Sequence, residues 1–135
     1  MPFYDLKKLP DLPVLLGTWY EGFKFVEQGE QYVREVHDLL GAQQSPVFYV
    51  LDFTPLHTMS IEGAMRSADS GARGPNPNLH HPMNCGNIFV SKAELVKMTA
   101  KGMRGPTYGN LDIKVFDTLD EALAYVEGEV LAGRG

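Results

Sequence analysis

The chain has 135 residues, of which 44% are hydrophobic, and its formal net charge is −5. This length suits one domain with its own hydrophobic core, so we expect residues 1–135 to form a single domain. The acidic balance argues against binding along the phosphate backbone of nucleic acid, because that mode needs a surplus of Lys and Arg to release counterions. No nucleic acid partner is expected.

The N-terminal residues 1–13 contain three prolines and two lysines without an apolar run behind them. They fit neither a signal peptide nor a membrane span, and we expect a proline-rich arm. The lone cysteine, Cys85, cannot form an intramolecular disulfide and fits a reducing compartment. We therefore expect a cytoplasmic protein that does not contact a membrane.

The first elements after the arm are a strand, a helix and a second strand. Residues 14–20 are rich in β-branched and aromatic side chains, which predicts a strand. Residues 47–51 are a continuous apolar run, typical of a central strand that is buried on both faces. Between them apolar side chains recur at helical spacing before Gly41 supplies a C-terminal stop. These side chains are Val26, Tyr32, Val33, Val36, Leu39 and Leu40.

A short helix and a long connection come next. Ser60 precedes Ile61, Ala64, Met65 and Ala68, which lie at i, i+3, i+4 and i+7. This spacing predicts an amphipathic helix with Ser60 as its N-cap. A connection rich in Gly, Pro and Asn follows over residues 69–86. Connections longer than about 12–15 residues are often functional or disordered, so we expect a specific surface here.

The last two units each begin with a strand, over residues 87–90 and 111–116. The second strand alternates apolar and polar residues, as expected near a sheet edge. Capping boxes are predicted at both helix starts, because Ser91 and Thr118 each precede a glutamate by three residues. Four strand-then-helix units predict an α/β fold with a mostly parallel sheet, although the strand order cannot be derived.

Two segments of the chain resemble the STAS-like, or SpoIIAA-like, family, which includes bacterial anti-sigma-factor antagonists. They are the strand end Asp52-Phe53-Thr54 with its loop to Ser60, and residues 115–125, whose sequence is VFDTLDEALAY. The similarity covers most of the chain after Pro13. It implies one α/β domain with a four- or five-stranded sheet and helices packed against it. It also implies a non-catalytic regulatory or interaction module that acts by protein–protein contact.

The resemblance further implies that Ser60 is a phosphoacceptor. In the antagonists an Asp-Ser-Ser-Gly-Leu segment carries a phosphorylated serine at a helix N-terminus, whereas this chain has Met59-Ser60-Ile61-Glu62-Gly63. Only Ser60 matches. A phosphate there would meet free backbone N–H groups and the positive end of the helix dipole, but Glu62 would oppose it. The residues themselves predict a plain N-cap.

The long connection contains four side chains that can ligate soft transition metals, namely His80, His81, Met83 and Cys85. Their spacing matches no zinc signature. Adjacent histidines in an extended chain also point to opposite sides. We therefore predict a structural or solvent-facing loop, with no metal and no other cofactor.

The alternative function is a small-ligand binder or minor enzyme. Ligand sites in parallel α/β sheets collect beyond the carboxyl ends of strands, where Asp52, Ser60 and Ser91 lie in sequence. The connection would add His80, His81 and Cys85 to this crevice. Cys85 with a histidine oriented by Asp52 is the one catalytic set that can be assembled. Because such side chains occupy turns and caps everywhere, we assign no catalytic residue.

An aromatic cluster surrounds Gly22, with two further rings on the N-terminal arm; its members are Phe3, Tyr4, Trp19, Tyr20, Phe23 and Phe25. No basic groove accompanies it, so these rings are expected in the core or in a subunit contact rather than in a base-stacking platform. The apolar excess predicts a homodimer. A further protein partner of unknown identity is also expected.

Overall fold

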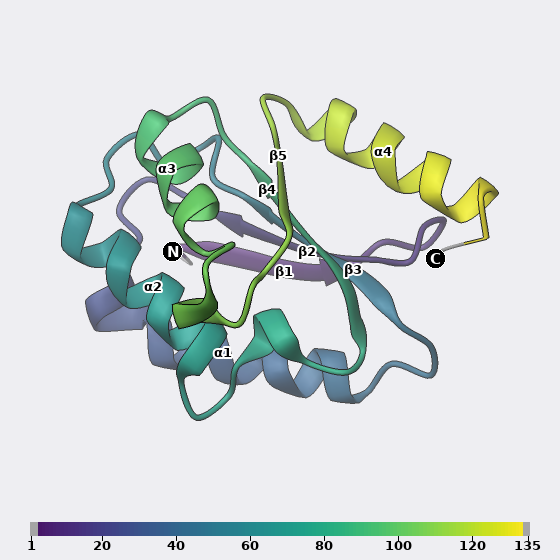
Figure 1. Cartoon of the computed structure of the whole chain (residues 1–135), viewed down its shortest axis with the longest axis horizontal. Helices are drawn as coiled ribbons and strands as arrows, with labels where there is room; N and C mark the ends of the chain where they lie inside the picture. Colours follow the sequence, from purple (N-terminus) through teal and green to yellow (C-terminus); the bar gives the residue numbers. More distant parts are fainter. Residues whose placement is uncertain (1–2, 134–135) are drawn as a thin grey trace.

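The computed structural model describes residues 3–133, which build one five-stranded sheet with helices on both faces (Figure 1). The strands lie in chain order. They are β1 (Tyr4–Lys8), β2 (Val14–Trp19), β3 (Val47–Asp52), β4 (Asn84–Val90) and β5 (Ile113–Phe116). β1 is antiparallel to β2, and every other neighbouring pair is parallel. The fold is therefore α/β with a mostly parallel sheet, as predicted.

The helices divide unequally between the two faces of the sheet. They are α1 (Phe25–Gly41), α2 (Ile61–Arg73), α3 (Glu94–Gly102) and α4 (Leu119–Leu131), with two short 3-10 helices, η1 (Asn78–His80) and η2 (Pro106–Tyr108). The first three each connect one strand to its next parallel neighbour. Such crossover connections have the same handedness, and the strand order never reverses. The helices α1, α2 and α3 therefore pack on the same face of the sheet. α4 packs alone on the other (Figure 1).

β3 occupies the centre of the sheet, and all six of its residues are buried, as the apolar run predicts. Its side chains alternate between two hydrophobic cores. Tyr49 and Leu51 belong to the core under α1–α3, whereas Phe48 and Val50 face α4. β5 lies at the edge, also as predicted.

Within the predicted proline-rich arm over residues 1–13, residues 4–8 form a strand. Tyr4–Lys8 pairs along β2, and the ammonium group of Lys8 closes the turn by donating to the carbonyls of Leu9 and Leu12 at 2.6 and 2.8 Å. Tyr4 and Leu6 are half-buried whereas Asp5 is exposed, a period-two pattern typical of an edge strand. Pro10 and Pro13 follow this strand and do not interrupt it. Residues 1–2 lie outside the described range.

The connection after α2 is shorter than the predicted loop over residues 69–86. α2 continues to Arg73, and β4 begins at Asn84. Ala72 extends the buried stripe by one turn, and Asp69 pairs with Arg73 at 2.7 Å across the same turn. The connection is therefore residues 74–83, which include η1.

The buried face of α2 is rotated relative to the predicted stripe. Ala64 and Ala68 are buried as expected, but Ile61 and Met65 are 68% and 57% exposed. The other buried positions carry small residues, including Gly63. α2 thus presents its small side chains to the sheet and its larger apolar ones to the surface. Similarly, Val26 of α1 is exposed, although the pattern predicted it in the core.

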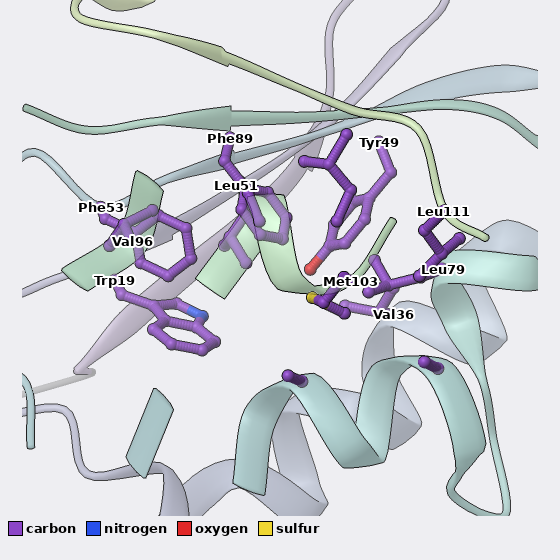
Figure 2. Packing of buried hydrophobic residues seen from close by; sticks show 14 of the residues in the cluster. Trp19, Val36, Tyr49, Leu51, Phe53, Leu79, Phe89, Val96, Met103 and Leu111 are labelled. Carbon is purple, nitrogen blue, oxygen red and sulfur yellow. The ribbon is translucent and has the colours of Figure 1, made fainter. Parts of the chain in front are cut away.

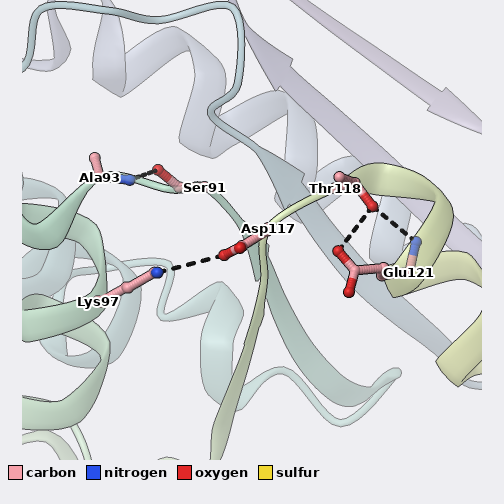
Figure 3. A network of polar contacts seen from close by, with 6 residues as sticks. All are labelled: Ser91, Ala93, Lys97, Asp117, Thr118 and Glu121. Carbon is pink, nitrogen blue, oxygen red and sulfur yellow. Dashed lines mark hydrogen bonds and ion pairs between the residues drawn. The ribbon is translucent and has the colours of Figure 1, made fainter.

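The two predicted capping boxes have different outcomes, both visible in Figure 3. Thr118 caps α4 by accepting from the Glu121 N–H at 3.2 Å, and its hydroxyl donates to the Glu121 carboxylate at 3.0 Å. The box at Ser91 is wrong, because α3 begins at Glu94 with Ala93 as its N-cap. The Ser91 hydroxyl instead accepts from the N–H of Ala93 at 3.0 Å, which shapes the turn before the helix.

Candidate functional site

The candidate crevice residues lie at opposite ends of the sheet. In the parallel pairing of β3 with β4, Asp52 stands beside Val90, whereas Asn84 stands beside Val47. Cys85 follows Asn84 at the amino end of β4. A strand rises about 3.3 Å per residue, so roughly 16 Å separates the level of Asp52 from that of Asn84. Asp52 therefore cannot orient a histidine that activates Cys85, and the one candidate catalytic set is not assembled.

Asp52 has a local structural role. Its side chain is buried, and one carboxylate oxygen accepts from the backbone N–H and from the hydroxyl of Thr54, at 2.8 and 2.7 Å. Both contacts fix the turn that leaves β3. A carboxylate with these two contacts forms an Asx-type turn, which is a common structural role for an aspartate at the end of a strand.

Ser91 lines a hollow at the carboxyl ends of β3, β4 and β5, together with Thr54, Lys92 and Thr118. An ion pair of 3.3 Å between Lys97 and Asp117 connects α3 to the end of β5 nearby (Figure 3). The strand order runs in one direction and never reverses. The sheet therefore lacks the topological switch point at which parallel α/β folds usually open a ligand crevice.

The two histidines of the connection before β4 make local contacts at the amino end of this strand. An imidazole nitrogen of His80 lies 2.9 Å from the carbonyl oxygen of Tyr108. His81 accepts from the N–H of Met83 at 3.0 Å, and its ring centre lies 5.3 Å from that of His37. Desolvation, and then the neighbouring His37, lower the pKa of His81 below its usual value. Both histidines thus have packing partners.

Cys85 is exposed at the opposite end of the sheet from Asp52. Desolvation nevertheless raises the pKa of its thiol. The thiolate is the reactive form of cysteine, and catalytic cysteines have lowered pKa values. Cys85 therefore lacks the environment of an activated nucleophile.

The described residues contain neither a metal-binding cluster nor a membrane-spanning helix. Among residues 3–133, no three His, Cys, Asp or Glu side chains gather closely enough to hold a metal ion. Within the same described range, no helix has both the length and the apolar character that are needed to cross a bilayer.

Ser60 caps α2 as predicted. Its hydroxyl accepts from the backbone N–H of Gly63 at 2.9 Å. The side chain lies at a surface groove between the start of α1 and the start of α2, with Val26 and Met59. The exposed Ile61 follows directly. The start of α2 thus combines an accessible hydroxyl with an apolar surface.

One feature of the structure was not predicted from the sequence, namely a partly open cavity of about 60 Å³ between the sheet and α1–α3. Trp19 and Tyr49 line it from the sheet, and Met103 lines it from the end of α3 (Figure 2). The hydroxyls of Tyr32 and Tyr49 share a hydrogen bond there, and burial raises the pKa of both well above the usual value. The sequence does show small residues on the side of α2 that faces the sheet. Small residues alone do not predict a cavity.

Comparison with known proteins finds similarity at the level of fold. No protein-family model matches the chain, and no curated protein matches it. Its structure is similar to the crystal structure of an uncharacterised protein of the DUF3478 family with a SpoIIAA-like fold, from Shewanella loihica PV-4. The TM-score is 0.59 at 15% sequence identity, over 91% of each chain. The chain thus has a SpoIIAA-like fold, in agreement with the resemblance seen in the sequence.

Proposed function

We propose that this protein of SpoIIAA-like fold is a non-catalytic regulatory module that acts by protein–protein contact through the exposed side of α2. The observation that carries the proposal is the exposure of Ile61 and Met65, at 68% and 57%. Residues four apart lie side by side on a helix, so the two side chains form one apolar row. The row begins directly after Ser60, the position that the family resemblance connects with regulation.

The charges beside this row favour a second copy of the chain as the partner. Glu62 and Arg66 form an exposed ion pair of 3.4 Å along the same helix. In a two-fold dimer the same patch meets itself, so Glu62 of one copy can face Arg66 of the other while the apolar rows pack together. The aromatic cluster gives less support to a dimer than predicted, because Trp19 and Phe23 are buried within the chain.

Light scattering at micromolar to millimolar concentration tests the proposal. We expect a dimer mass for the wild-type protein and a monomer mass for the double variant Ile61→Ser with Met65→Ser, because both apolar contacts are lost. Leu131→Ser is the matched control, since Leu131 is 89% exposed on α4, on the other face of the sheet. A monomeric wild-type protein, or a dimer that survives the double substitution, would contradict the proposal.

The alternative function, a small-ligand binder or minor enzyme with a crevice near Asp52 and the His80–Cys85 connection, has less support. Its residues stand at opposite ends of the parallel strands. The surroundings of Asp52 and Cys85 are those of a turn residue and an unactivated thiol.

A further inference from the structure

We propose that the outer edge of β1 binds an extended segment of a partner protein as an added antiparallel strand, with a lysine or arginine of that segment facing Glu35. The proposal goes beyond the contact surface on α2 and concerns a different part of the molecule, the first edge of the sheet.

The register of the hairpin shows which backbone groups of β1 point away from the sheet. The carbonyl of Phe3 accepts from the N–H of Tyr20, and the N–H of Leu9 donates to the carbonyl of Val14, both at 2.9 Å. In an antiparallel pair, successive residues direct their N–H and C=O groups alternately toward the partner strand and away from it. The odd-numbered residues of β1 therefore pair with β2. The residues whose N–H and C=O groups point outward are Tyr4, Leu6 and Lys8.

The opposite edge of the sheet is shorter and partly blocked. β5 has only four residues. The carbonyl of Phe116 accepts from the N–H of Ser91, which directly follows β4, so the carbonyl of Ile113, three residues earlier, points outward. The guanidinium group of Arg104 donates to this outward carbonyl at 3.4 Å. Unpaired strand edges are templates for another strand, and β1 is the edge that remains open to one.

A groove of about 480 Å³ lies beside the open edge of β1. Residues 3–6 line it from the strand side, and Gln28, Gln31 and Glu35 line it from α1. Neighbouring strands lie about 4.8 Å apart, and their side chains alternate between the two faces of a sheet. Every second side chain of an added strand would therefore enter this groove and meet α1.

Glu35 sets the charge of the segment that fits the groove. Its carboxylate accepts from the hydroxyl of Tyr4 at 2.6 Å and from the side-chain amide of Gln31 at 3.3 Å, which fixes its position. Desolvation, and then Glu35, raise the pKa of Tyr4 to about 12, so the hydroxyl keeps donating at neutral pH. Within residues 3–133, Glu35 takes part in no ion pair. A carboxylate without a counter-charge complements a lysine or arginine on the added strand.

A short peptide tests both parts of the proposal. The probe has the sequence Thr-Val-Thr-Arg-Thr-Val-Thr with blocked termini, and the control peptide has glutamate in place of arginine. In hydrogen exchange followed by NMR, the amides of Tyr4, Leu6 and Lys8 should exchange more slowly when the arginine peptide is bound. The amides of Asp5 and Lys7 already face β2 and should change little. The glutamate peptide is expected to bind about fivefold more weakly, because it brings a like charge to Glu35.

Glu35→Gln should remove the preference for the arginine peptide, since it keeps an acceptor for the Tyr4 hydroxyl but no charge. Glu30→Gln is the matched control on α1, because Glu30 is exposed and pairs with Arg34, and it should retain the preference. If Glu35→Gln does not fold, added salt should weaken the preference of the wild-type protein, because salt screens exposed charges.

The double variant at Ile61 and Met65 should still bind the peptide, which separates this proposal from the contact surface on α2. Unchanged exchange at Tyr4, Leu6 and Lys8, or equal affinity of the wild-type protein for the two peptides, would overturn it.

Discussion

At the scale of single residues, Ser60 satisfies a backbone N–H that the first turn of α2 would otherwise leave without an acceptor. We expect Ser60→Ala to lower the free energy of unfolding by about 0.5–2 kcal/mol and Ser60→Asp to be nearly neutral, because aspartate caps as well as serine does. Urea unfolding measures both. Ser45→Ala, in an exposed loop, is the control.

The same pair of variants tests the phosphoacceptor that the family resemblance implies at Ser60. A regulatory phosphate acts through local charge at an interface. If Ser60→Asp melts like the wild type but changes the mass measured by light scattering, Ser60 is more than a cap. Unchanged association would leave capping as its role.

His81 gives a second prediction at this scale. Its lowered pKa means that the folded state holds a proton on this ring less readily than the unfolded state. The stability contributed by neutral His81 is therefore complete above pH 6.5, the usual histidine value, and is lost as the pH falls through the lowered pKa. Protonation would also remove the acceptor that binds the Met83 N–H.

Urea unfolding in the pH range below the usual histidine pKa measures this loss of stability. His81→Gln should flatten the acid-side loss of stability, whereas His57→Gln, at an exposed position, should retain the wild-type slope. An unchanged slope in His81→Gln would assign the pH dependence to other groups.

At the scale of elements, the side chains of three asparagines connect η1 to β4 and to α1 through hydrogen bonds. The amide of Asn87 donates to the carbonyl of Leu79 at 2.9 Å, and its oxygen accepts from Asn84 at 2.7 Å. Asn84 also donates to the carbonyl of Asn78 at 3.0 Å. The connection over residues 74–83 is thus held to β4 by side-chain hydrogen bonds, of which the one between Asn87 and Leu79 is buried.

Asn87→Leu should therefore lower the free energy of unfolding by about 1–3 kcal/mol, since it leaves the buried carbonyl of Leu79 without its donor and removes one of the two acceptors of the Asn84 amide. Asn76→Ala, in the same connection but outside this network, should change stability much less. Guanidinium unfolding of both variants checks the prediction, and equal effects would mean that the network contributes little.

The elements that the sequence predicted correctly have strong local signals. Thr118 and Glu121 form their cap from neighbouring residues alone, and the apolar run of β3 needs no distant information. The rotation of α2 depends on packing against the sheet, where Ala64 and Ala68 lie opposite the large rings of Trp19 and Tyr49. Ser91 was misassigned since a hydroxyl can bond the N–H two residues ahead as readily as the one three ahead.

At the scale of the whole molecule, the strand order determined which candidate site residues meet. Asp52, Ser91 and Cys85 each lie at or next to the end of a strand, but parallel pairing separates the carboxyl ends from the amino ends. The candidate crevice mixed residues from both ends. The cavity could not be predicted, because it depends on side chains of α1, α2 and α3 meeting over three strands, and sequence patterns contain no volumes.

The agreement between strand order and chain order also has a consequence for biosynthesis. A ribosome releases the N-terminal hairpin of β1 and β2 first, and each later strand then finds its neighbour already made. Only one helix and its connections separate each parallel strand from the next, which keeps loop-closure costs low. The sheet can therefore grow outward from the hairpin during translation, with β5 and α4 docking last.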